Sequence, residues 1–207
     1  MELRVAVSAP APLEGKVAGG LSELGCDVAV LDQGGVSTRE EAIGELRRLG
    51  TIDALVVAPA AAGGASFLET GEEAWIRGAE APIWHALVLF QAAHATGASV
   101  VAALPSIALT GAADLVPFAA AAEGIRQLVK SAARAWGAEG VRVNCVTLPV
   151  EEWGIEVPAV PNRYGASLPG QNSAADIAGA IALLAGPLAG GVNGATVGLD
   201  RGTVLAP

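Results

Sequence analysis

Short runs of apolar, β-branched residues alternate with longer helical stretches along the whole chain, and this alternation constrains the fold more than any other feature. A helix between successive strands implies right-handed crossovers and a parallel sheet with helices on both faces. Strands buried on both faces read as continuous apolar blocks, as ALVVA does at residues 54–58. We expect a three-layer α/β fold with six strands, at residues 3–8, 28–31, 54–58, 98–104, 141–146 and 196–199.

Capping residues mark where several helices begin. Ser37 and Thr38 each precede a glutamate by three residues, which predicts two overlapping capping boxes. Thr70 is expected to start another helix, which continues or restarts at Pro82, and Ser173 is the predicted N-cap of the last helix. The predicted helices span about residues 13–24, 37–49, 70–81, 82–95, 116–136 and 173–184, and the proline-rich residues 149–172 are expected to form an irregular loop.

The composition limits the possible functions. The chain has 207 residues, 52% apolar and 16% charged, which fits one domain over residues 1–207 with a large core. The formal net charge of −9 argues against binding to nucleic acid or to anionic membranes, because both need an excess of lysine and arginine. Cys26 and Cys145 are too few for a disulfide framework or a zinc site.

Two stretches without charged residues, at 81–113 and 177–199, are longer than the roughly 20 residues that cross a bilayer. Histidine, glutamine, glycine and proline interrupt them, so both fit buried strands and helices, and we predict no membrane span. The N-terminus is charged where a signal peptide would be apolar. A cytoplasmic protein is therefore expected.

Four stretches resemble motifs of the short-chain dehydrogenase/reductase family. Residues 141–146 (VRVNCV) are similar to its I-R-V-N-x-V strand, and residues 194–202 (GATVGLDRG) to its closing G-x-x-x-x-V-D-G-G. Residues 53–57 (DALVV) and 91–93 (QAA) resemble its D-x-L-V-N strand and its central helix. The resemblance implies a Rossmann-like sheet, NAD or NADP, and a Ser–Tyr–Lys site assisted by an Asn. Only one helix fits between the second and third strands, so one edge βα unit of the family's seven-stranded sheet is expected to be missing.

The family's glycine-rich phosphate loop, T-G-x-x-x-G-x-G, is degenerate in this chain. The corresponding residues 8–15 keep only Gly15, and Pro10 and Pro12 remove two N–H donors. Glu14 adds a carboxylate to the first helical turn, where it would repel a phosphate. Asp32 stands where the family holds the adenosine ribose, although an Asp at a strand end is commonly a turn residue. We therefore expect no cofactor, and Gly15 and Asp32 are interpreted as vestigial.

The family's catalytic residues are also replaced. Its Y-x-x-x-K pair, in which the lysine lowers the pKa of the tyrosine, corresponds to Phe118 and Ala122. Its relay Asn corresponds to Pro82, which has no polar side chain. Ser106 lies near the position of the substrate-orienting serine and is the one candidate that persists, but a serine at this point can also simply end the strand.

Other polar residues give weaker indications. His85 and His94 are nine residues apart and do not share a helix face, so they are interpreted as core or interface histidines. Tyr164, in the proline-rich loop, could replace the missing phenol only if the loop folded inward. The cations Arg126, Lys130 and Arg134 recur every four residues; they fit a solvated helix face, an acidic partner, or a phosphate-bearing ligand such as coenzyme A.

These observations favour a degenerate family member without dehydrogenase activity, acting as a structural or regulatory subunit. In the family, two long helices pair across a four-helix interface, and the corresponding segments 82–95 and 116–136 keep an apolar, alanine-rich character. A homodimer, or a heteromer with an active paralogue, is expected. Two alternatives stay open: an NAD(P)-dependent oxidoreductase with a remodelled site using Ser106, and a small-molecule binder that uses the emptied nucleotide cleft.

Overall fold

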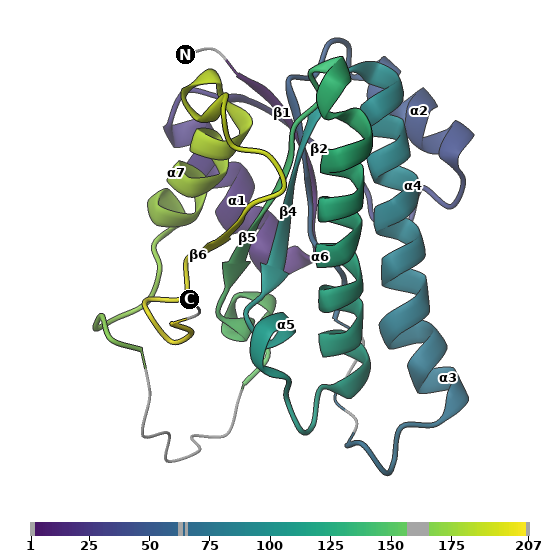
Figure 1. Ribbon diagram of the computed structural model, residues 1–207, viewed down its shortest axis with the longest axis vertical. Coiled ribbons are helices and arrows are strands. Elements are labelled where there is room, and N and C mark those ends of the chain that lie inside the picture. Colours follow the sequence, from purple (N-terminus) through teal and green to yellow (C-terminus); the bar gives the residue numbers. More distant parts are fainter. Residues whose placement is uncertain (1–2, 62–63, 65, 157–165, 206–207) are drawn as a thin grey trace.

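The computed structural model describes residues 3–61, 64, 66–156 and 166–205. It contains a fully parallel sheet of six strands in the order β2-β1-β3-β4-β5-β6, between two layers of helices (Figure 1). The predicted Rossmann-like α/β fold is confirmed. The strands are β1 (Arg4–Ser8), β2 (Asp27–Val30), β3 (Ala54–Val57), β4 (Ser99–Pro105), β5 (Val143–Leu148) and β6 (Thr196–Gly198).

Strand β2 forms one edge of the sheet, and the chain passes from it through a single helix to β3 on the far side of β1. The expected absence of one edge βα unit is thus confirmed. The helices are α1 (Ala11–Glu23), α2 (Arg39–Arg48), α3 (Glu72–Trp75), α4 (Ala81–Thr96), α5 (Ile107–Thr110), α6 (Val116–Trp136) and α7 (Ala174–Ala185). A π-helical segment, Ile76–Glu80, joins α3 to α4, and 3-10 turns occur at Gly137–Glu139, Val150–Trp153 (η3) and Pro187–Ala189.

The sheet separates two hydrophobic cores. On one face, α2, α4 and α6 pack against the strands through buried residues such as Leu46, Phe90 and Ile125. On the other face, α1 and α7 do so through residues such as Val17 and Ile181. The central strands contribute side chains to both cores in turn, which explains their continuous apolar sequences. No helix among the described residues is long and apolar enough to span a membrane.

The start of α2 confirms one of the two predicted capping boxes. Thr38 is the N-cap, its hydroxyl accepts the N–H of Glu41 at 3.3 Å, and the Glu41 carboxylate accepts the N–H of Thr38 at 3.0 Å. The predicted Ser37–Glu40 box is wrong. Only the third residue after the N-cap reaches back, so the Ser37 hydroxyl and N–H both donate to Glu41 instead. The predicted cap of α7 is confirmed: Ser173 forms a capping box with Asp176.

The predicted start of the next helix needs a correction. Gly71, not Thr70, is the N-cap of α3, and the Thr70 hydroxyl donates to the carbonyl of Ser66 at 2.7 Å. The chain then runs through the π-helical segment Ile76–Glu80 directly into α4, with Pro82 as the second residue of α4.

Strand β5 begins two residues later than predicted, at Val143. The guanidinium of Arg142, just before it, donates to four carbonyls at and after the end of α7, those of Leu184, Ala185, Gly186 and Ala189, at 2.6–3.2 Å. Asn144 fastens the loop before β6 by donating to Val192 O at 2.9 Å and accepting Ala195 N–H at 3.0 Å. The R-V-N part of the motif thus has a structural role.

Candidate functional site

The candidate site is the crevice above the carboxyl ends of β1 and β3. From β1 the chain turns to one side of the sheet to form β2, and later to the other side to form β3, so the strand order reverses between β1 and β3. Open α/β sheets bind their ligands at such a switch point. Ser8 ends β1, and Ala58 and Pro59 follow β3, so these residues border the crevice.

The first turn of α1 has lost the features of a phosphate site. Pro10 is the N-cap, with φ −70° and ψ 155°, and Pro12 lies in the first turn, so neither supplies an N–H. Glu14 adds its carboxylate to the same turn. Gly15 is exposed, and no atom lies within 4 Å of the position where a Cβ would be. This glycine therefore makes no close approach that only glycine would permit.

The η3 turn covers the start of α1. A Cβ on Gly154, at φ +72°, would lie 3.2 Å from Cγ of Pro12, so the backbone after η3 packs directly on the first turn. Glu152 is only 5% exposed, and its carboxylate pairs with Lys16 Nζ at 2.6 Å. A buried carboxylate needs such a partner, so this pair fixes η3 against α1.

Trp153 extends from η3 into the crevice. Its indole N–H donates to the carbonyl of Pro59 at 2.8 Å, directly after β3. Its ring meets Phe118 edge to face, with the centroids 5.9 Å apart. Trp153 is 5% exposed and Phe118 1% exposed. An aromatic pair therefore spans from the end of β3 to the position that corresponds to the family's catalytic tyrosine.

A second side chain crosses the same edge of the sheet. Gln33, just after β2, donates from Nε2 to the carbonyl of Ala58 at 2.7 Å. Its neighbour Asp32 is exposed and accepts the N–H of Gly34 at 3.0 Å, which is an Asx turn. The structure therefore gives Asp32 a turn contact, and Gln33 ties the second strand's loop to the third strand.

The third contact at this edge joins Ser8 and His85. The Ser8 hydroxyl lies 3.5 Å from Nε2 of His85, and the ring also hydrogen-bonds to the backbone of Val36. Burial lowers the pKa of His85 below its ordinary value, while the bond to Val36 acts in the opposite direction. Ser8 is 1% exposed, so this serine–histidine contact links α4 to β1 and does not present a nucleophile.

The replaced catalytic positions are buried apolar sites. Phe118 and Ala122 lie one turn apart in α6, and Pro82 begins α4; all three are buried. No side chain among them offers or accepts a proton. Ser106 follows β4 and is 8% exposed; its N–H donates to the carbonyl of Leu148 at 2.7 Å, and its hydroxyl makes no capping bond to α5. Its backbone thus joins the end of β4 to β5.

The other candidate residues lie elsewhere. His94 stacks on Trp136, with ring centroids 4.7 Å apart, and its Nε2 lies 3.0 Å from Glu139. Tyr164 lies outside the described residues. Within the described ranges, no three His, Cys, Asp or Glu residues form a group that could hold a metal ion.

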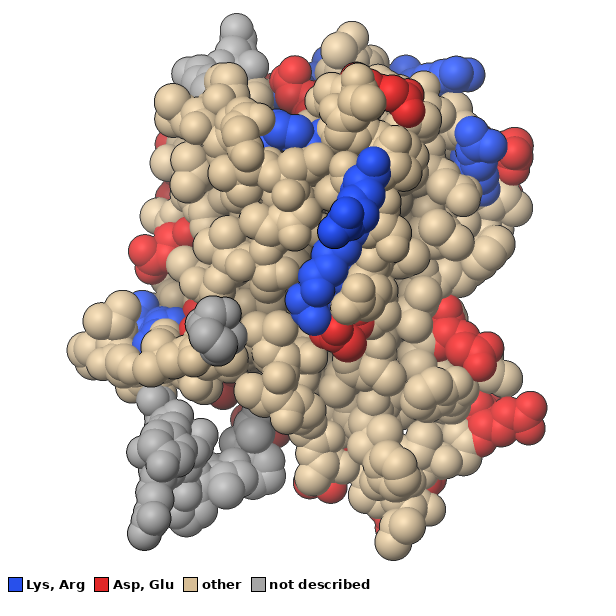
Figure 2. Space-filling view, in the orientation of Figure 1, with Lys and Arg blue, Asp and Glu red and all other residues tan. Residues whose placement is uncertain are grey.

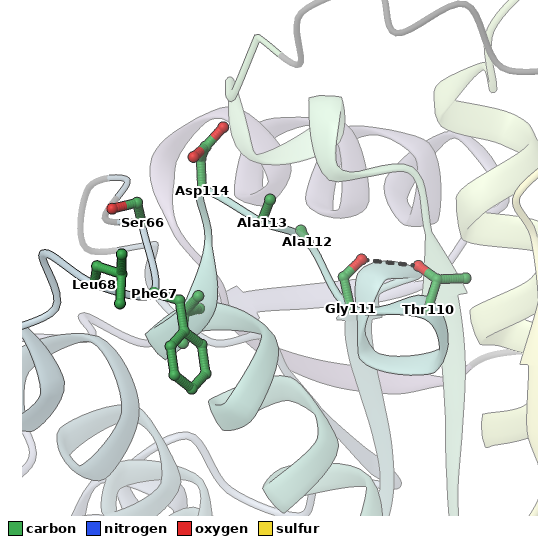
Figure 3. A pocket seen from close by; sticks show the side chains of 9 residues that line it. Ser66, Phe67, Leu68, Thr110, Gly111, Ala112, Ala113 and Asp114 are labelled. Atoms are coloured by element: carbon green, nitrogen blue, oxygen red, sulfur yellow. Dashed lines mark hydrogen bonds between the residues drawn. The ribbon is translucent and has the colours of Figure 1, made fainter.

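A hollow of about 600 Å³ lies between two loops that follow β3 and β4 (Figure 3). Figure 3 shows Ser66, Phe67 and Leu68 on one side and the segment from Thr110 to Asp114 on the other. Phe67 and Leu68 are 77% and 97% exposed, so the hollow is shallow and largely apolar. It is separate from the contacts that Trp153 and Gln33 make.

Sequence reasoning missed Trp153 and Gln33. Both follow strands directly or within a few residues, and a large aromatic residue after β5 was the available signal for Trp153. Their hydrogen-bond acceptors could not be identified from the sequence, because Ala58 is 25 residues from Gln33 and Pro59 is 94 residues from Trp153.

The comparisons with known proteins agree with this architecture. The sequence profile described as enoyl-(acyl carrier protein) reductase matches residues 4–204. No curated protein matches the sequence. A short-chain oxidoreductase from Pseudomonas aeruginosa PAO1, described as containing an atypical catalytic center, is 18% identical; each chain is covered over 100% and the TM-score is 0.77. A short-chain dehydrogenase/reductase family oxidoreductase from Burkholderia thailandensis is 17% identical over 100% of this chain and 94% of its own, with a TM-score of 0.81.

Proposed function

The chain belongs to the short-chain dehydrogenase/reductase family, and we propose that within this family it is a structural or regulatory subunit without dehydrogenase activity. One observation carries the proposal: Trp153, held by Pro59 O and Phe118, lies buried at the switch point at which an open α/β sheet binds a dinucleotide. The family is usually NAD(P)-dependent, but the residues present here do not fit that cofactor.

Four further features support the loss of cofactor binding. Pro10 and Pro12 remove N–H donors from the start of α1, Glu14 adds negative charge there, and Gly154 packs on Pro12. A pyrophosphate would need all of these contacts to rearrange. No step of a hydride transfer is assigned to this chain, since Phe118 and Ala122 supply neither a proton nor a charge.

The retained parts of the family resemblance are structural. Arg142 and Asn144 fasten α7 and the loop before β6, as described above. Helices α4 and α6, which correspond to the predicted association segments 82–95 and 116–136, lie side by side: a Cβ on Gly124 would be 2.8 Å from Cδ1 of Ile83. The chain therefore keeps the residues that hold the fold together while the catalytic residues are replaced.

Association through α4 and α6 is part of the proposal. Helix α4 carries no Asp, Glu, Lys or Arg, and Trp84 on its surface is 59% exposed. A homodimer, or a heteromer with an active member of the family, would cover this apolar surface. Sedimentation velocity on the purified chain, alone and with a co-expressed active member, measures this directly; a monomer in both cases would contradict the subunit role.

The cofactor part is tested by thermal shift with the oxidised and reduced forms of NAD and NADP. A ligand at 100 times its Kd adds about 2.7 kcal/mol. For a chain of this size each kcal/mol raises Tm by about 2–4 °C, so binding would raise Tm by roughly 5–11 °C. We expect no shift with any of the four, while an active family member serves as the positive control. A saturable shift would refute the proposal.

The Pseudomonas aeruginosa neighbour with an atypical catalytic center supports a second candidate, an oxidoreductase with a remodelled site. In this case Ser106 would orient the substrate, and the Ser106→Ala variant would lose the turnover that the wild type shows. We expect no turnover in either the wild type or the variant. The third candidate is a small-molecule binder. Because Trp153 and Gln33 occupy the switch point, its ligand would bind in the shallow hollow beside Phe67.

A further inference from the structure

Three cations lie along one surface of α6. Arg126, Lys130 and Arg134 are spaced by four residues, and Figure 2 shows a continuous blue band over α6 on an otherwise mostly tan face. We call these three residues the basic stripe. From Arg126 to Arg134 the helix rises about 12 Å, at 1.5 Å per residue. The stripe is therefore longer than a single small anion.

Among the residues that the structure describes, only the first cation of the stripe makes an ion pair. Arg126 makes a two-point contact with Glu123, Nε to Oε2 at 2.7 Å and Nη2 to Oε1 at 2.6 Å. Among the described residues, no carboxylate lies within ion-pair distance of Lys130 or Arg134. The Glu123 carboxylate also attracts Lys130, but without direct contact. The chain as a whole carries a net charge of −9, so a stripe of three cations with one paired carboxylate is a local reversal of its charge.

The stripe differs from an ordinary solvated helix face. Like charges four residues apart destabilise a helix, and the stripe contains two such steps. Helix α2, which is exposed, shows the usual arrangement instead: it interleaves Arg39, Arg47 and Arg48 with Glu40, Glu41 and Glu45. The stripe thus keeps an unfavourable arrangement on α6, one of the two helices of the proposed association surface.

A hollow of about 520 Å³ beside the stripe narrows the class of ligand. Lys130, Ala133, Arg134, Asn193 and Gly194 line it. The polar groups of the floor are already used: Asn193 donates to Ala133 O and accepts Val143 N–H, and Gly194 N–H donates to Val143 O. A bound phosphate group usually takes several free N–H donors. Gly194 N–H is used, and the Asn193 amide keeps at most its second N–H. The cations are the main groups that remain available.

We propose that the basic stripe and the hollow beside Lys130 and Arg134 form a docking surface for a partner protein that presents carboxylates at helical spacing. Acidic side chains four residues apart on an antiparallel helix match the spacing of the stripe. Charge complementarity selects a different protein rather than a second copy, because two stripes facing each other would repel. This inference deepens the proposed subunit role and rests on it, and it identifies the partner surface as acidic.

The test uses as its probe a fluorescein-labelled, alanine-rich helical peptide with a glutamate at every fourth position, so that the carboxylates lie on one helix face. Binding to the full-length protein is measured by fluorescence anisotropy at 50 mM salt. The variant Lys130→Glu/Arg134→Glu reverses the stripe. The matched control Arg39→Glu/Arg47→Glu makes the same change in net charge on exposed cations of α2. We expect saturable binding by the wild type, at least 10-fold weaker binding by the stripe variant, and less than 2-fold change in the control. Circular dichroism and Tm confirm that both variants fold.

Several results would overturn the inference. These are no binding of the helical acidic peptide by the wild type, an equal loss in the control, or saturable binding of inorganic phosphate or coenzyme A at the stripe without binding of the peptide. A wild-type dimer that the stripe variant dissociates would identify a second copy as the occupant. The cofactor titration is independent of all of these, so a failure of the docking surface and a failure of the proposed function are distinguishable.

Discussion

Replacing Trp153 by alanine tests whether the crevice is a filled core. The indole is 5% exposed, meets Phe118 edge to face at 5.9 Å, and donates to Pro59 O at 2.8 Å. Removing a buried tryptophan or phenylalanine side chain typically costs about 3–5 kcal/mol. At about 2–4 °C per kcal/mol, this predicts a fall in Tm of roughly 6–20 °C, measured by differential scanning calorimetry.

Two further variants separate the contributions. Trp153→Phe keeps an aromatic ring but leaves the Pro59 carbonyl without its donor, which is expected to cost about 1–3 kcal/mol. Trp84→Ala is the matched control, because Trp84 is 59% exposed and its N–H reaches Ser37 O only at 3.4 Å; an exposed site of this kind is expected to cost within about 0.5 kcal/mol. Equal losses for Trp153→Ala and Trp84→Ala would show that the crevice is not packed as described.

Three other predictions concern stability. Arg142→Ala leaves four carbonyls near the end of α7 without their donor and is expected to cost at least about 1.5–3 kcal/mol in urea unfolding, while Arg47→Ala on the surface changes little. Hydrogen bonds from Ser37 and Thr38 lower the pKa of Glu41 to about 2. The contribution of the ionised Glu41 to folding stability is therefore present above the ordinary pKa of 4.5 and is lost as pH falls from 4.5 towards 2. The Glu41→Gln variant should flatten this part of the stability–pH curve. Burial lowers the pKa of His85, so on acidification the imidazole takes up its proton in the unfolded chain before it does so in the folded one. Folding stability should therefore decline as pH falls below 6.5. A His85 imidazole that titrates at or above 6.5 by NMR would contradict this.

Most of the fold could be predicted from the sequence because its signals are local. The continuous apolar runs identified the strands, and the bounds of α6 were correct at residues 116–136. The capping box at Thr38 and the N-cap at Ser173 were predicted because each depends on residues within one helical turn. Errors arose at element ends: the N-cap of α3 is Gly71 rather than Thr70, and β5 starts at Val143 rather than at residue 141.

The correspondence of Phe118, Ala122 and Pro82 to the family's catalytic positions came from the sequence alone, through the resemblance. The structure adds that all three side chains are buried. The expectation of an emptied cleft did not anticipate the side chains that stand there. Gln33 and Trp153 lie in loops and were not identified as site residues. No sequence pattern links them to their acceptors, the carbonyls of Ala58 and Pro59.

By itself, the sequence determined the strands, the helices and the absence of one edge unit, because these depend on periodicity, on caps and on the number of residues between strands. Only the tertiary structure decided what fills the switch point. The Glu152–Lys16 pair and the packing of Gly154 on Pro12 join residues more than a hundred positions apart, and together they hold η3 on α1. The direction of Trp153 follows from that long-range contact, since a loop's own residues do not fix where it packs.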